Sequence, residues 1–167
     1  MVQARAWHIF MLTFGLFLIY DLCFDLFSND IHTYLLGKNI AGVVCSFFVL
    51  AWIWGVRNAL QDKISVSLRQ YNLLFRLFFV FVCVYLLSME FYFLIYGVFP
   101  QSLTLLICHL LAILFLAGAM LLLSRDLVLA ESNKRPIAEE YFRVFVLILI
   151  FPIGIWFIQK RINRLFL

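Results

Sequence analysis

Four long apolar runs constrain the fold of this chain more than any other feature. They extend over residues 7–27, 39–56, 72–99 and 102–124. A helix needs about 20 apolar residues to cross the roughly 30 Å hydrocarbon core of a bilayer. Its backbone then satisfies its own hydrogen bonds, as lipid requires. We therefore predict a single all-α domain over residues 1–167, an integral membrane bundle with four transmembrane helices.

The composition supports a membrane environment. Hydrophobic residues make up 66% of the chain and charged residues 13%, whereas soluble domains usually contain about 25% charged residues. The net charge of +4 comes from Lys and Arg that flank apolar runs, where they set membrane orientation. No basic patch is interleaved with aromatic residues in the manner of a nucleic-acid site. We expect the lipid bilayer as a partner and no nucleic acid.

A fifth apolar run, at residues 144–158, is too short for an ordinary span and contains Pro152 and Gly154. Proline removes a backbone donor, and glycine lets the backbone bend. We predict that these two residues form a hinge in a C-terminal element over residues 137–166. This helix–Pro–helix element is expected to be re-entrant or interfacial. The alternative is a fifth transmembrane helix with a tolerated proline kink.

The distribution of basic residues favours four crossings with the N-terminus in the cytoplasm. In that topology only Lys38, of the 13 Lys and Arg residues, lies outside, and the other twelve lie inside. If the last run also crosses, three more basic residues move outside, and the bias falls to nine against four. Those three residues are Lys160, Arg161 and Arg164.

The end of the C-terminal element has two faces. Its apolar positions recur at helical spacing, and its basic residues fall on the other side, as in a helix that lies on a membrane surface. We predict that the basic face contacts anionic lipid headgroups on the cytoplasmic side. The apolar positions are Ile155, Ile158, Ile162 and Leu165, and the basic ones are Lys160, Arg161 and Arg164.

Rare ionisable residues inside the spans are the candidate functional groups, because charge is costly in a bilayer. Asp21, Asp25, Glu90 and His109 all fall in the outer half of the predicted topology, and Asp30 and His32 lie in the adjacent loop. Carboxylates and imidazole bind cations and exchange protons. The alternative is structural, with acids near the headgroups and Glu90 bonded to His109 as a helix-packing pair.

Other chemistry has little support. We expect no cofactor, because two haem-ligating histidines must lie at similar depth, and His8 and His109 belong to opposite ends of the bundle. The remaining pair, His32 with His109, would place one ligand in a loop. The sequence leaves open whether a metal binds. No motif for a nucleophilic catalyst occurs, so no catalytic residue is assigned. The four cysteines all lie within apolar runs without a C-x-x-C pair, which is typical of small buried hydrophobic residues.

The segment from Phe151 to Arg164, FPIGIWFIQKRINR, resembles the C-terminal ending of small uncharacterised polytopic membrane proteins of bacteria, as does the preceding AEEYF segment. The resemblance implies a bacterial inner membrane and no particular activity. From the residues, the first hypothesis is a non-enzymatic accessory or scaffold subunit that contacts other membrane subunits. The alternatives are a proton- or cation-handling transport protein and an intramembrane enzyme acting on a lipid-linked substrate.

Overall fold

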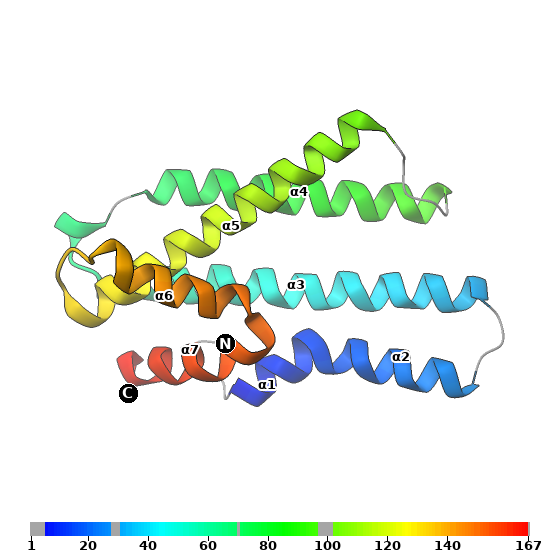
Figure 1. Ribbon diagram of the computed structural model, residues 1–167, viewed down its shortest axis with the longest axis horizontal. Helices are drawn as coiled ribbons and strands as arrows, with labels where there is room; N and C mark the ends of the chain where they lie inside the picture. Colours follow the sequence, from blue (N-terminus) through cyan, green and yellow to red (C-terminus); the bar gives the residue numbers. More distant parts are fainter. Residues whose placement is uncertain (1–5, 28–30, 70, 97–101, 167) are drawn as a thin grey trace. The chain divides into compact units, whose positions relative to one another are not determined.

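The computed structural model describes residues 6–27, 31–69, 71–96 and 102–166, and within these ranges every regular element is helical (Figure 1). The all-α prediction is confirmed for this part of the chain. The residues group into two compact units. The first unit comprises Met1–Lys63 and Val146–Leu167, and the second comprises Ile64–Phe145.

The first unit begins with a helical run that is divided by a π-helical turn. It consists of α1 (Ala6–Phe10), the π-helix η1 (Met11–Gly15) and α2 (Leu16–Phe27). The Thr13 hydroxyl donates to the carbonyl of Ile9 at 2.8 Å, which satisfies a polar group that is almost fully buried. Such a turn changes the direction in which side chains leave the helix.

Helix α3 (Ile31–Lys63) packs against α2 and η1 and is longer than predicted at both ends. The predicted second span ended at residue 56, but α3 continues through Arg57 and Gln61, which are both buried. A polar residue can remain in a helix where neighbouring elements cover its side chain. The last turns of α3 thus combine the buried polar residues Arg57 and Gln61 with the exposed polar residues Asn58, Asp62 and Lys63.

The C-terminal helices are α6 (Ala138–Leu149) and α7 (Phe151–Phe166), and the unit boundary falls within α6. Aromatic contacts Phe10–Trp156 and Phe14–Phe151, at 6.3 and 5.8 Å between ring centroids, join α7 to the first helical run in antiparallel orientation. Helix α7 runs parallel to α3, because Trp52 contacts Gln159 and, farther along both helices, Lys63 contacts Phe166.

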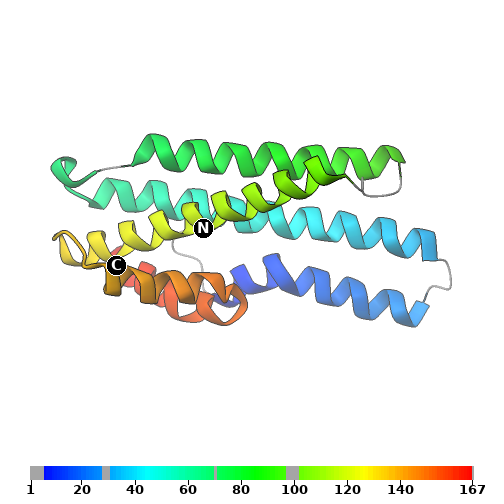
Figure 2. The ribbon, with the colours of Figure 1, turned by 45° about the horizontal axis from the view of Figure 1, so that its top comes forward.

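The second unit contains the 3₁₀ turn η2 (Val66–Leu68), α4 (Asn72–Tyr96) and α5 (Leu103–Ser132). Helices α4 and α5 pack against each other, as Figure 1 and Figure 2 show. Phe115 stacks on Phe78 at 5.0 Å and meets Phe81 edge-on at 4.7 Å, so these rings form the centre of the α4–α5 contact. Gly118 faces the Phe78 ring, where a side chain would leave no room.

The ends of α5 have defined caps. The Ser102 hydroxyl accepts from the Leu105 N–H at 3.1 Å at the start, as is typical of an N-cap serine. Asn133 ends the helix in the left-handed region with φ 51°, a conformation that asparagine tolerates. Helix α5 thus extends beyond the predicted end at residue 124, and Asp126 is buried within it.

Three helical segments are long and apolar enough to cross a membrane among the described residues: Gly37–Lys63, Asn72–Phe93 and Leu103–Ser132. These correspond to the second, third and fourth predicted spans. The first predicted span is helical from residue 6 to 27, but η1 divides it into shorter helices.

Candidate functional site

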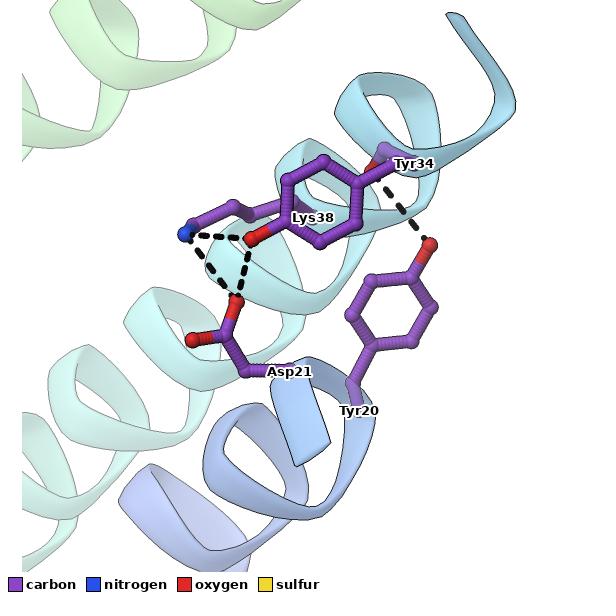
Figure 3. Close-up of polar contacts among 4 residues, drawn as sticks. All are labelled: Tyr20, Asp21, Tyr34 and Lys38. Atoms are coloured by element: carbon purple, nitrogen blue, oxygen red, sulfur yellow. Dashed lines mark hydrogen bonds and ion pairs between the residues drawn. The ribbon is translucent and has the colours of Figure 1, made fainter. Parts of the chain in front are cut away.

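Asp21 lies in a hydrogen-bonded cluster between α2 and α3 (Figure 3). The Tyr34 hydroxyl donates to Asp21 Oδ1 at 2.7 Å, and Lys38 Nζ lies 3.0 Å from the same oxygen. Lys38 also donates to the Tyr34 hydroxyl at 2.9 Å, which closes a triangle of polar contacts. Tyr20 donates from its hydroxyl to the Tyr34 carbonyl at 3.3 Å. One carboxylate of the predicted site therefore joins two helices.

The spacing of the cluster follows from helix geometry. Tyr34 and Lys38 are four residues apart, so both face α2 from the same side of α3. The side chains of Asp21 and Lys38 are 37% and 38% exposed, so solvent or headgroups reach the ion pair. Lys38 supplies a positive charge opposite Asp21, and the charge of the carboxylate is balanced locally. The sequence already set Lys38 apart, because it is the only Lys or Arg that the predicted topology places outside, but its pairing with Asp21 was not predicted.

The other predicted residues of the outer half are distributed over both units. Asp25 belongs to α2 of the first unit, but its side chain, like that of His32, is outside the described set, and Asp30 lies in 28–30, outside the described residues. Glu90 on α4 and His109 on α5 belong to the second unit.

His109 is bonded to a tyrosine of the neighbouring helix. The Tyr85 hydroxyl lies 2.8 Å from His109 Nδ1, and the two rings are 5.8 Å apart between centroids. The structural alternative predicted Glu90 as the hydrogen-bond partner of His109, but in the structure this partner is Tyr85. Glu90 is half-buried on α4. His109 therefore forms an exposed hydrogen bond between α5 and α4.

A buried polar contact that the sequence did not suggest joins α3 to α7. Trp52 Nε1 donates to Gln159 Oε1 at 3.0 Å, and Gln159 Nε2 donates to Asn163 at 2.9 Å. Trp52 and Gln159 are 1% and 0% exposed. Farther along, Lys63 Nζ lies 5.2 Å from the Phe166 ring centroid, so the two helices are parallel. A single Gln in an amphipathic helix matches no sequence motif. The role of Gln159 is therefore visible only from its contact with Trp52 in the folded protein.

The predicted basic residues of α7 occupy its outer surface. Lys160 and Arg164 are exposed and Arg161 is half-buried, whereas Ile155, Ile158 and Ile162 are at most 1% exposed. The apolar face that was expected to lie in the membrane surface is therefore packed inside the protein.

The predicted hinge lies at a tight turn between α6 and α7. The Ile150 carbonyl accepts from the N–H groups of Ile153 at 3.0 Å and Gly154 at 2.7 Å. Pro152 is the second residue of α7, where a missing N–H costs nothing because that donor has no helical partner. At Gly154, a Cβ atom would overlap the Leu147 carbonyl. The turn itself is at Ile150, two residues before the proline.

No group of three or more His, Cys, Asp or Glu residues among the described ones lies close enough together to hold a metal ion. Of the cysteines, Cys45 is buried, Cys83 and Cys108 are half-buried, and Cys23 is exposed. Comparisons with known protein families, curated proteins and solved structures found no match to this chain.

Proposed function

We propose that this chain is a small non-enzymatic subunit or scaffold of a bacterial inner-membrane complex. One observation carries the proposal: polar side chains in the apolar helices form contacts between three pairs of neighbouring helices. Asp21 connects α2 to α3, His109 connects α5 to α4, and Gln159 connects α7 to α3. Polar contacts of this kind stabilise helix association in lipid.

The topology proposed is four transmembrane helices, a cytoplasmic N-terminus and a re-entrant C-terminal hairpin. The exposed surface of α6 and α7 supports the hairpin. The exposed side chains around the turn are apolar, and charged side chains occur only farther from it along each helix, with Arg143 paired to Glu139 on α6 and Lys160 and Arg164 on α7. The exposed apolar residues around the turn are Val146, Leu149, Ile150, Ile153, Trp156 and Phe157.

Each of the two helices is too short to cross the membrane by itself. Helix α6 has 12 residues and α7 has 16, which correspond to about 18 and 24 Å at 1.5 Å per residue. Neither reaches the roughly 30 Å needed to cross, and the close approach of Gly154 to Leu147 reverses the chain between them. All basic residues except Lys38 then lie on the cytoplasmic side.

Cysteine labelling tests the topology. The four native cysteines are replaced by alanine, and single cysteines are introduced at Ser65, at Ser102, at Lys134 and after Leu167. A membrane-impermeant maleimide added to intact cells should label only Ser102→Cys, and the others should react after the cells are opened. Labelling of the C-terminal cysteine in intact cells would contradict the hairpin and favour five spans.

A double-mutant cycle distinguishes the structural role of Asp21 from proton or cation handling. Asp21→Asn leaves Lys38 without its counter-charge and should lower the stability of the purified protein by about 1 kcal/mol, the scale of a partly exposed ion pair. Lys38→Met added to Asp21→Asn should restore most of this loss. In proteoliposomes, wild type and Glu90→Gln should show no proton or cation flux above empty vesicles. A flux that requires Asp21 or Glu90 would replace the scaffold proposal with a transport function.

A further inference from the structure

A straight stripe of exposed side chains on α7 changes from apolar to basic along the helix. Ile153, Phe157, Lys160 and Arg164 recur at intervals of four, three and four residues, which places them on one helix face. Ile153 is 63% exposed and Phe157 is 58% exposed, and both basic residues are exposed as well. Trp156 borders the apolar half of the stripe.

The transition from apolar to basic side chains runs along the axis of α7, and this direction determines how the helix can be oriented in a membrane. A helix lying flat on a bilayer separates apolar from basic residues around its circumference. On α7 the opposite face is taken by Ile158, Gln159 and Ile162, which are buried, and the exposed face separates the two classes along its axis. Such a helix meets lipid with its axis steeply inclined and its N-terminal end deeper.

The stripe has the length of one lipid leaflet. From Ile153 to Arg164 the helix rises about 16 Å at 1.5 Å per residue, close to half of the roughly 30 Å hydrocarbon core. Apolar side chains occupy the deep half and basic side chains occupy the half nearest the headgroups. The order matches that of a phospholipid molecule, with acyl chains below and phosphate above.

We propose that this stripe binds one anionic phospholipid of the cytoplasmic leaflet lengthwise, with an acyl chain along Ile153 and Phe157 and the phosphate between Lys160 and Arg164. This inference rests on the proposed re-entrant hairpin. Charge complementarity selects an anionic lipid, because α7 contains no acidic residue. In contrast, the basic residue of α6 is already neutralised, since Arg143 pairs with Glu139.

Native mass spectrometry of the full-length protein in mild detergent tests the proposal. The protein is incubated with equal amounts of phosphatidylglycerol and phosphatidylcholine that carry the same acyl chains, and the bound lipids are counted. Wild type should retain phosphatidylglycerol about twenty-five-fold over phosphatidylcholine, because each of the two basic residues near an anionic surface contributes about fivefold. Lys160→Gln with Arg164→Gln should bring the ratio close to one.

Two further variants make the result specific. Lys134→Gln with Arg135→Gln removes the same charge from exposed positions before α6 and should keep the wild-type ratio. Lys160→Arg with Arg164→Lys retains the charges and should keep it too. An unchanged ratio in the α7 glutamine variant, or an equal fall in both glutamine variants, would overturn the proposal.

The topology experiment separates this inference from the proposed function. If the C-terminal cysteine is labelled only in opened cells and the lipid preference is absent, the lipid site is wrong and the hairpin stands. If that cysteine is labelled in intact cells, the hairpin and the lipid site are both wrong.

Discussion

The α4–α5 contact and the α6–α7 turn each bring helices together at a glycine, but different atoms face the two glycines. Gly118 faces the Phe78 ring, with Cε2 at 2.6 Å from the place a Cβ would take. Gly154 faces the Leu147 carbonyl of the backbone. A ring can rotate or shift, whereas a carbonyl moves only with its helix. The turn should therefore tolerate less change than the contact between the long helices.

The largest effect is expected at Gly154. Gly154→Ala should cost about 3 kcal/mol of unfolding free energy, at the upper end of overpacking penalties, because the added Cβ forces α6 and α7 apart. Denaturant unfolding in mild detergent measures this cost. Gly42→Ala and Gly55→Ala are matched controls, since nothing lies within 4 Å of an added Cβ at either. These helical substitutions should be neutral or stabilising. If Gly154→Ala lowers the unfolding free energy no more than the two control substitutions do, the Leu147 carbonyl does not make the turn less tolerant of change.

Gln159→Leu should come next, with a loss of about 2 kcal/mol. The substitution leaves the buried Trp52 indole N–H without its acceptor, and an unsatisfied buried donor costs about 1–3 kcal/mol. Trp52→Phe combined with Gln159→Leu should recover part of the loss, which the same unfolding assay would detect. If the double variant is less stable than Gln159→Leu alone, the indole–amide bond is not the reason for the loss.

Gly118→Ala should lower stability by only about 1 kcal/mol, because the Phe78 ring can yield although it is stacked on Phe115. The substitution Phe78→Leu in the same chain should relieve the crowding. Gly118→Ala and Gly154→Ala add the same methyl group, so the difference between their losses measures how a ring and a carbonyl respond to the same crowding. Equal losses at the two sites would show that ring and carbonyl resist displacement alike.

The smallest effect is expected for Tyr85→Phe. The variant removes the hydroxyl that meets His109 at an exposed position, and such a bond contributes about 0.5 kcal/mol. Thermal unfolding in detergent should change little, and aromatic packing around Phe115 should keep α4 and α5 together. A loss as large as that for Gln159→Leu would assign this polar pair the main role in the α4–α5 contact.

Much of the helical organisation followed from the sequence because apolar runs and caps act locally. Asn72 stands where the predicted third helix begins and Ser102 where the predicted fourth begins, and the structure agrees at both. The ends of α3 and α5 were missed, because Arg57 and Asp126 look like loop residues until their burial is known. The candidate site was predicted by depth alone. Depth identified Asp21 and His109 as unusual, but it did not reveal Lys38 and Tyr85 as their partners.

By itself the sequence determined that this chain is helical and suited to lipid, since hydrophobicity and backbone hydrogen bonding depend on residue type and run length. Tertiary structure decided what the polar groups do. Asp21 pairs with Lys38, and Gln159 accepts from Trp52, because packing brings side chains from separate helices within 3.0 Å. It also decided which side of α7 is exposed, since the isoleucine face is buried and the stripe from Ile153 to Arg164 remains on the surface. Periodicity can divide a helix into faces, but only the neighbouring helices determine which face is covered.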